Sequence, residues 1–185
     1  MVKVLAFLAP GLEEVECLAV VDLLRRAGME VPLVSMGEGP VIRGAHGIRI
    51  VCDLCFDALD PTGADALFLP GGMPGTANLA AHEGLCALLR QWSAQGKRLA
   101  AICAAPSVLG ELDLLRGRRA TCYPGWEHAL RGASYTAEGV VTDGMITTAR
   151  GLGFALDLGL ELVRLFQGDA AAEALARAIQ HPRTL

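Results

Sequence analysis

The sequence predicts a doubly wound α/β sandwich, in which helices cover both faces of a central, mostly parallel β-sheet. Short β-rich runs alternate with helical segments along the chain, which is typical of this class. Several of the β-rich runs are almost continuously apolar, as expected for strands that are buried on both faces. The 185 residues contain no internal repeat, low-complexity tract or linker. We therefore expect residues 1–185 to form a single domain with a sizeable core.

Each element follows from a local pattern. Strands are expected at residues 3–8, 30–35, 48–52, 66–69, 99–102, 120–122 and 145–148. Helical patterns fill the intervals at residues 13–27, 84–95, 104–115, 153–166 and 169–180. Residues 37–53 contain turn residues and no helical period, which favours a small hairpin or an extension of the sheet edge. Ligands of such folds bind beyond the carboxyl ends of the strands, so the residues that follow each strand are the first candidates for function.

The composition excludes several classes of protein. Apolar residues make up 52% of the chain and charged residues 19%, which excludes intrinsic disorder. The net charge of −4 leaves no basic surplus for binding nucleic acid. The longest uncharged stretch, residues 66–81, is interrupted by prolines and glycines, and no signal peptide is recognised. We therefore expect a cytoplasmic protein without a membrane partner, whose six cysteines are thiols.

The sharpest local signal is a strand that runs directly into Cys103, followed by small residues and Pro106. Proline is favoured in the first turn of a helix, so this pattern predicts a strand–nucleophile–helix elbow. The N-terminus of that helix is expected to stabilise the thiolate and to lower the pKa of Cys103 from about 8.5. The alternative is a buried structural cysteine, which is common in protein cores.

A second signal is Glu16, which falls within the apolar stripe of the first helix, whereas Glu14 lies outside it. A carboxylate buried without a partner is costly, so we expect Glu16 to hold its proton or to meet a donor. The alternative, that acidic residues in a first helical turn only complement the helix dipole, explains Glu13 and Glu14 better than Glu16.

A glycine-rich turn follows the strand at residues 66–69 and includes Gly71 and Gly72. Its bare N–H groups could hold a developing oxyanion beside the nucleophile, although a Gly-Gly turn often only reverses the chain. Cys52 and Cys55 have the spacing of a zinc or redox pair, but no second pair accompanies them, so we expect no metal site. The four histidines are scattered and none has a local motif.

Four motifs together resemble the ThiJ/PfpI superfamily, and most of all the branch of the parkinsonism-associated protein deglycase and its bacterial relatives. They lie at residues 11–16, 69–72, 100–106 and 148–153, the last including Arg150. The resemblance implies a flavodoxin-like sandwich, usually a homodimer, with Cys103 as nucleophile and Glu16 hydrogen-bonded to its sulfur. It also implies oxyanion donors from the backbone of Gly72 and Ala104, and a pocket that includes Gly71, Tyr123 and Arg150.

The chain departs from this family pattern at the positions where a histidine would act as a base. Tyr123 stands where many relatives of the branch carry histidine, and Ala104 stands where proteolytic members do. His128 could reach the pocket only by a loop excursion. The usual Cys–His pair is therefore not visible, which weakens a peptidase or amidase function.

The motifs lead to one preferred function and to alternatives. We expect a cofactor-free glyoxalase or deglycase that acts on 2-oxoaldehydes such as methylglyoxal, or on their adducts, with Cys103 and Glu16 titrating as a coupled pair. The alternative is an oxidative-stress sensor or chaperone that uses an oxidisable Cys103. An intracellular protease or amidase, or an amidotransferase-like subunit, is less favoured by the sequence.

Overall fold

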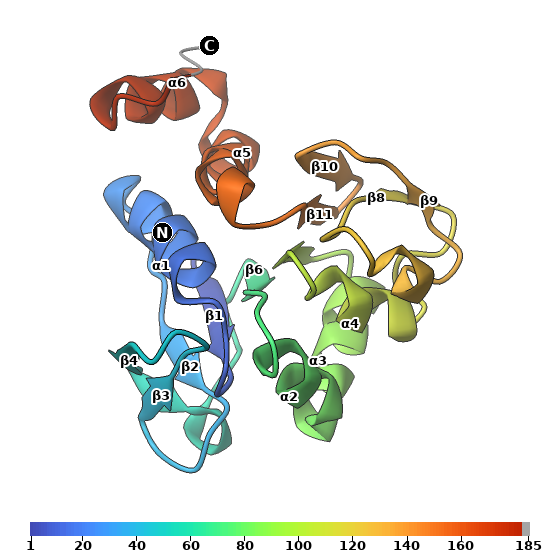
Figure 1. Ribbon diagram of the computed structural model, residues 1–185. Coiled ribbons are helices and arrows are strands. Elements are labelled where there is room, and N and C mark those ends of the chain that lie inside the picture. Colours follow the sequence, from blue (N-terminus) through green and yellow to red (C-terminus); the bar gives the residue numbers. More distant parts are fainter. Residues whose placement is uncertain (183–185) are drawn as a thin grey trace.

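A seven-stranded sheet lies between two helical layers in the computed structural model, which describes residues 1–182 (Figure 1). The strand order is β10-β11-β7-β6-β1-β2-β5. All neighbouring strands pair in parallel except β10, which is antiparallel to β11. The bounds are β1 Val4–Leu8, β2 Leu33–Ser35, β5 Leu54–Cys55, β6 Ala66–Leu69, β7 Arg98–Ile102, β10 Val140–Asp143 and β11 Ile146–Ala149. The predicted fold class is confirmed.

Alternate strand residues supply the two hydrophobic cores, because successive side chains of a strand point to opposite faces. On β1, Val4, Ala6 and Leu8 belong to one core, and Leu5 and Phe7 belong to the other. The first core packs under α1 (Glu14–Arg26), α5 (Ala155–Gln167) and α6 (Asp169–Ala178), and the second packs under α3 (Glu83–Ala94) and α4 (Pro106–Glu111). Figure 1 shows α1 and α5 on one side of the sheet and α2 (Gly75–Ala81), α3 and α4 on the other.

Two small β-structures extend the sandwich. β3 (Val41–Arg43) and β4 (Arg49–Val51) form an antiparallel hairpin, which is one of the two arrangements expected for residues 37–53. β8 (Arg119–Ala120) and β9 (Ser134–Tyr135) form a separate parallel pair. The strand expected at residues 120–122 is therefore shorter than predicted and lies outside the main sheet.

The helix expected at residues 104–115 is also shorter than predicted, since α4 ends at Glu111. Asp113, two residues later, has a φ of 60°, a left-handed conformation that a helix cannot include. The sequence pattern also did not predict α2, which begins at Gly75 within the glycine- and proline-rich turn after β6. No helix within residues 1–182 has the length and hydropathy that a bilayer span requires.

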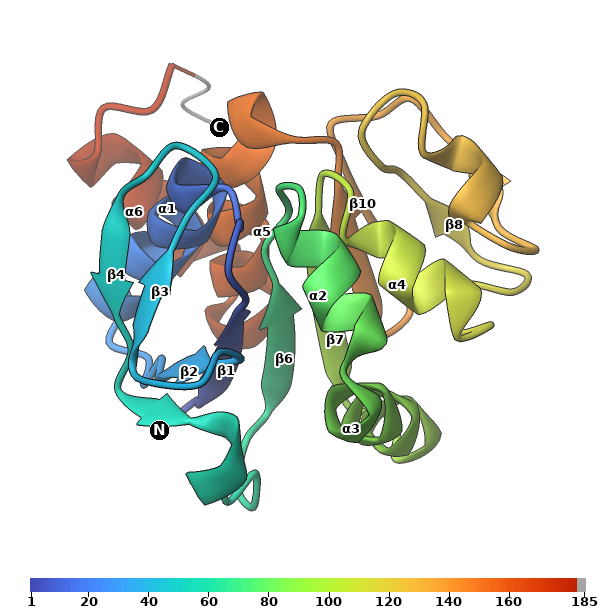
Figure 2. The ribbon, with the colours of Figure 1, turned by 60° about the horizontal axis from the view of Figure 1, so that its bottom comes forward.

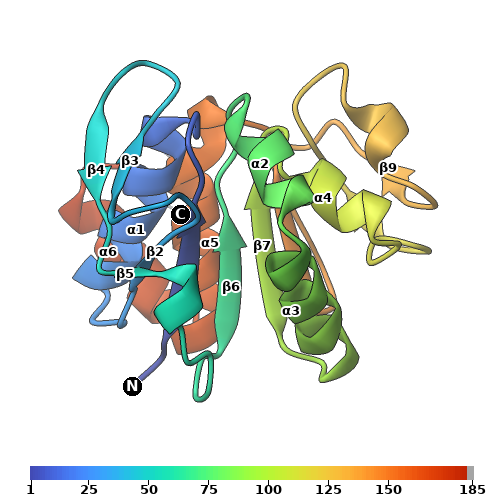
Figure 3. The same ribbon diagram turned by 90° about the horizontal axis from the view of Figure 1, so that it is seen from below.

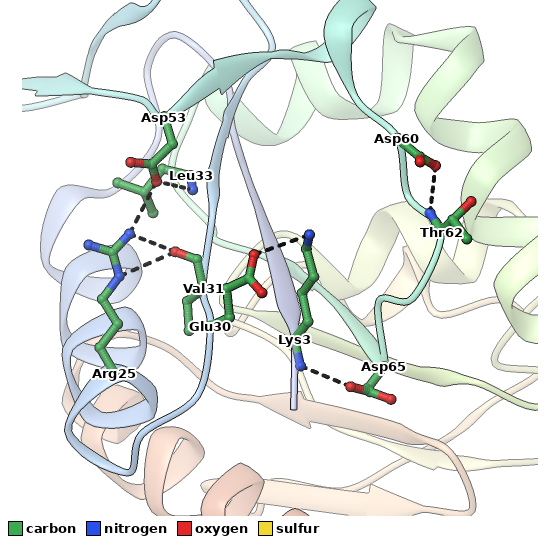
Figure 4. A network of polar contacts seen from close by, with 9 residues as sticks. All are labelled: Lys3, Arg25, Glu30, Val31, Leu33, Asp53, Asp60, Thr62 and Asp65. Carbon is green, nitrogen blue, oxygen red and sulfur yellow. Dashed lines mark hydrogen bonds and ion pairs between the residues drawn. The ribbon is translucent and has the colours of Figure 1, made fainter. Parts of the chain in front are cut away.

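A polar network fastens the amino ends of the parallel strands (Figure 4). The Lys3 backbone N–H donates to Asp65 at 2.9 Å, and the Lys3 ammonium lies 3.1 Å from Glu30. Nearby, Asp53 accepts from the backbone of Leu33 at 2.7 Å and from Arg25 at 3.2 Å. β6 and β7 run side by side away from this end (Figure 3). The opposite edge of the sheet, where the parallel strands end, is the edge at which folds of this class bind their ligands.

Candidate active site

Cys103 occupies a strained turn between β7 and α4, at the carboxyl edge of the sheet. Its N–H donates to the carbonyl of Ala149 at 2.9 Å, which continues the pairing of β7 with β11. Its φ is 64°, in the left-handed region that non-glycine residues rarely adopt. Its carbonyl accepts the N–H of Tyr123 at 2.8 Å. The backbone is therefore held on both sides of the thiol, as in the elbow that the sequence predicts.

Glu16 meets Cys103 above Gly71. A Cβ atom added to Gly71 would lie 2.5 Å from the Cys103 Cβ and 2.5 Å from the Glu16 Oε2. Contacts this short are not tolerated between non-bonded atoms, so only glycine fits between the two side chains. The turns that carry Gly71 and Cys103 follow the neighbouring strands β6 and β7 and lie side by side (Figure 2). The structure thus brings together Glu16, Gly71 and Cys103 from three separate segments.

The Glu16 side chain is buried, with only 1% of the residue exposed. No group in residues 1–182 makes a hydrogen bond of ordinary geometry to its Oε2. Burial therefore raises the pKa of Glu16 to about 7, and the nearby charge of Glu13 adds to the rise. The Cys103 thiol and the N–H groups of Gly71 and Leu152 act in the opposite direction. A carboxyl group with this pKa can donate or accept a proton near neutral pH.

Burial also raises the pKa of the Cys103 thiol, to about 12, and the Glu16 carboxylate contributes to the rise. The N–H groups of Gly72 and Ala104 face the sulfur and oppose it. The expectation that a helix N-terminus lowers this pKa is therefore wrong. The six-residue helix α4 starts only at Pro106, and the loss of solvent outweighs its effect.

The two predicted oxyanion donors flank the thiol. Gly72 and Ala104 both direct backbone N–H groups toward the Cys103 sulfur. Gly72 has a φ of +90°, and a Cβ there would overlap the backbone of Leu12 and Glu13. The turn therefore requires glycine both for its conformation and for its close approach to the start of α1.

Tyr123 and Arg150 are placed differently from each other. Tyr123 is 51% exposed, and its backbone bonds directly to Cys103. Arg150 follows the β11 residue that bonds to Cys103, but its guanidinium donates to the carbonyl of Ala137 at 3.3 Å. Tyr123 is therefore bonded directly to the residue that carries the thiol, whereas the Arg150 guanidinium is directed to Ala137.

The acidic turn before α1 holds two residues, Glu13 and Glu14, whose sequence positions suggest only an interaction with the helix dipole. Glu13 caps α1 by accepting the N–H of Glu16 at 2.7 Å, which fixes the position of Glu16. Glu14 is buried rather than outside the apolar face. Its carboxylate accepts the N–H groups of His46 at 2.9 Å and Ile48 at 3.2 Å, and it lies 3.1 Å from the His46 ring. Glu14 thus anchors the β3–β4 hairpin to α1.

The remaining candidate residues are the other cysteines, one acidic cluster and His128. Cys52 is buried and Cys55 half-buried, and all six cysteines are free thiols. Within residues 1–182, the one group with metal-ligand spacing is Glu13, Glu14 and His46, and the Glu14 oxygens are already hydrogen-bonded. His128 is exposed and contacts the carbonyl of Gly125 at 3.1 Å.

Comparisons with known proteins identify the family. The model of the DJ-1/PfpI family matches residues 2–165. Protein DJ-1 homolog B of Arabidopsis thaliana is 31% identical over 177 residues, which are 95% of this chain and 40% of that protein, so this chain spans less than half of its length. Deglycase PH1704 of Pyrococcus horikoshii is 35% identical over 150 residues, which are 80% of this chain and 89% of that protein.

The solved structures lead to the same family. Oxidized Toxoplasma gondii DJ-1 matches with a TM-score of 0.94 and 32% identity, over 98% of this chain and 100% of that chain. With the family model covering most of the sequence and relatives above 30% identity, the chain belongs to the DJ-1/PfpI family.

Proposed function

We propose that this chain is a cysteine-dependent glyoxalase or deglycase that acts on methylglyoxal-like 2-oxoaldehydes or on their adducts. The observation that carries the proposal is the approach of the Cys103 thiol to a buried carboxyl group whose pKa is about 7. A nucleophile beside an acid–base group is the arrangement that covalent catalysis on a carbonyl needs. Relatives named deglycases support the same reaction class.

The first step adds the thiol to the aldehyde carbon. The sulfur–carbon bond forms, the carbonyl π bond breaks, and the thiol proton passes through Glu16 to the new alkoxide oxygen. The product is a hemithioacetal on Cys103. The N–H groups of Gly72 and Ala104, which face the sulfur, would stabilise the alkoxide while it is charged.

The second step moves one proton between adjacent carbons. Glu16 accepts the proton from the former aldehyde carbon, the electron pair of that C–H bond forms an enediolate, and Glu16 returns the proton to the neighbouring carbon. The hydroxyl proton of the former hemithioacetal carbon passes to the alkoxide oxygen of that neighbouring carbon, so that a thioester carbonyl and a 2-hydroxyl group result. One carbon is oxidised and the other reduced, so the rearrangement needs no external oxidant. The resulting thioester is hydrolysed by water: its C–S bond breaks, a 2-hydroxy acid leaves, and Cys103 recovers its proton.

The test is a rate assay with purified protein and methylglyoxal, in which lactate is measured as the product. Cys103→Ser is nearly isosteric, and we expect it to lower kcat by roughly a thousandfold or more while the circular dichroism stays unchanged. Cys55→Ser is the matched control, because Cys55 is the other half-buried thiol. Lactate formation at an equal rate by Cys103→Ser, or none by the unaltered protein, would refute the proposal.

The second candidate function is that of a redox sensor or chaperone. Four of the six cysteines are buried, whereas Cys103 and Cys55 are partly accessible. Cys103 also has a carboxyl group beside it that could donate a hydrogen bond to an oxidised sulfur. Absence of aldehyde turnover, together with selective oxidation of Cys103, would favour this function over catalysis.

We also propose that the protein is a cytoplasmic homodimer. Exposed apolar residues gather on α1 and on the hairpin that Glu14 anchors to it: Val15, Leu18, Val41, Ile48 and Val51. A second copy would bury this surface. Light scattering at micromolar concentration should give twice the mass of 19.4 kDa, and Leu18→Glu should give a monomer. A monomeric unaltered protein would contradict the proposal.

A further inference from the structure

Three large apolar side chains are exposed on residues whose backbone lies next to the Cys103–Glu16 pair. Tyr123 is 51% exposed, Leu152 50% and Met73 47%. Each is tied to the pair through the backbone. The Tyr123 N–H donates to the Cys103 carbonyl at 2.8 Å, and the Leu152 N–H faces the Glu16 carboxylate. Met73 directly follows Gly72, whose N–H faces the Cys103 sulfur. We call these three side chains the apolar collar.

The Tyr123 ring lies over Gly151, beside the Glu16 carboxylate. A Cβ added to Gly151 would be 3.3 Å from the Cδ2 of Tyr123 and 3.9 Å from the Oε1 of Glu16. The ring and the carboxylate therefore both lie next to Gly151. Because the ring is half exposed while the carboxylate is buried, the ring stands at the entrance and the carboxylate at the floor of the site.

The proposed chemistry fixes how a substrate must lie in this site. Its aldehyde carbon bonds to the Cys103 sulfur, and its second carbon exchanges a proton with Glu16. The remaining substituent has to point outward, past the collar. The Arg150 guanidinium, which belongs to the residue two positions before Leu152, is directed to the carbonyl of Ala137. The collar thus offers apolar contact and an aromatic face to that substituent.

We propose that the collar selects 2-oxoaldehydes with a bulky apolar substituent, such as an aryl group, over small or polyhydroxylated ones, with the Tyr123 ring as the main determinant. This inference rests on the proposed function and names its substrate class. Burial of apolar surface favours such a substituent, and stacking on an aromatic ring adds to the preference. An aryl group that covers part of the collar would gain about tenfold in kcat/KM over a methyl group, a typical discrimination for an apolar contact of this size.

The test compares phenylglyoxal with methylglyoxal, which differ by phenyl for methyl, by measuring mandelate and lactate as products. The readout is the ratio of the two kcat/KM values, because comparing this ratio between variants cancels the intrinsic reactivity of the aldehydes. Tyr123→Ala should lower the ratio about tenfold, whereas Tyr123→Phe should keep it, since the ring rather than the hydroxyl makes the contact. Tyr135→Ala on β9 is the matched control and should leave the ratio unchanged. An unchanged ratio in Tyr123→Ala would overturn the inference.

Failure of the proposed function is distinguishable from failure of the collar. If neither aldehyde is turned over, the proposed function fails, and the collar is tested by alkylation of Cys103. Phenacyl bromide and bromoacetone also differ by phenyl for methyl, and both react with a thiol by displacement of bromide. The ratio of their rates at Cys103, followed by peptide mass mapping, should fall about tenfold in Tyr123→Ala. An equal ratio in the unaltered protein and in Tyr123→Ala would refute the collar.

Discussion

Replacing Glu16 with glutamine removes a buried ionisation and should change how the stability of the protein depends on pH. Burial raises the pKa of Glu16 from 4.5 to about 7. Between these two pH values the native state holds a proton that the unfolded state has released. The stabilisation is therefore full below pH 4.5 and is lost as the pH rises through 7. One pKa unit corresponds to about 1.4 kcal/mol, so the loss amounts to about 3 kcal/mol.

Glutamine has no such titration, so the variant should gain stability relative to the unaltered protein as the pH rises. The measurement is urea unfolding at several pH values from 4 to 8, at one fixed protein concentration, so that any association contributes equally. The free energy of unfolding of Glu16→Gln, minus that of the unaltered protein, should increase by about 3 kcal/mol across this range. Subtracting the two curves removes the titration of all other groups.

Glu14→Gln is a control of opposite sign on the same helix. Burial alone would raise the pKa of Glu14, but hydrogen bonds from the backbone and from His46 and Ile48 outweigh it and lower the pKa. The stability that Glu14 contributes is present above its ordinary pKa of 4.5 and is lost as the pH falls. The difference curve of Glu14→Gln, extended down to about pH 3 because this transition lies below pH 4.5, should therefore move downward with rising pH. A flat curve for Glu16→Gln would show that Glu16 ionises normally, and the argument from burial would fail.

Three further predictions concern the thiol. Gly71→Ala should lower aldehyde turnover at least about a hundredfold, because the added methyl group separates Glu16 from Cys103. Gly39→Ala is the control and should be neutral, since its methyl group meets nothing within 4 Å; full activity of Gly71→Ala would contradict the geometry. The pH of half-maximal alkylation of Cys103 by iodoacetamide should be lower in Glu16→Gln than in the unaltered protein, because the Glu16 carboxylate raises the pKa of the Cys103 thiol. An unchanged or higher pH would refute the electrostatic coupling of Glu16 with Cys103. Limited peroxide should oxidise Cys103 first and add two oxygens to its sulfur, a reaction that Glu16→Gln should preserve and Glu16→Asp should impair. Peptide mass mapping that finds a buried cysteine oxidised before Cys103 would exclude this preference for Cys103.

Most of the sheet could be predicted because its strands are buried on both faces and are therefore continuously apolar. β1, β6, β7 and β11 fall within or close to the expected ranges. β5 has two residues, too few to show a period. β10 is only partly buried and includes Thr142 and Asp143, so its pattern is that of a turn rather than a buried strand. Residues 183–185 lie outside the described part of the chain and follow the last expected helix.

Glu16 and Cys103 could be found from the sequence because each breaks a local rule. Glu16 places a carboxylate in an apolar stripe, and Cys103 interrupts a strand–helix junction. The burial of Glu14 could not be found, because its hydrogen-bond partners lie on a hairpin more than thirty residues later. The direction of the Cys103 pKa shift could not be predicted either. A sequence shows where a helix starts, but it does not show how far the folded chain excludes solvent from the thiol.

The proton chemistry of the Cys103–Glu16 pair favours aldehyde isomerisation over peptide hydrolysis. Hydrolysis of a peptide needs a base for the nucleophile and then an acid for a poorly departing amine, a double task for which cysteine proteases use histidine. Here the group beside the thiol is a carboxyl with a pKa of about 7, and neither Ala104 nor Tyr123 supplies an imidazole. Aldehyde isomerisation has no amine to expel. Its proton transfers are from sulfur to oxygen, from one carbon to the next, between the two substrate oxygens and, in the hydrolysis, from water to sulfur. A single carboxyl group that takes up and returns one proton can perform each of them in turn.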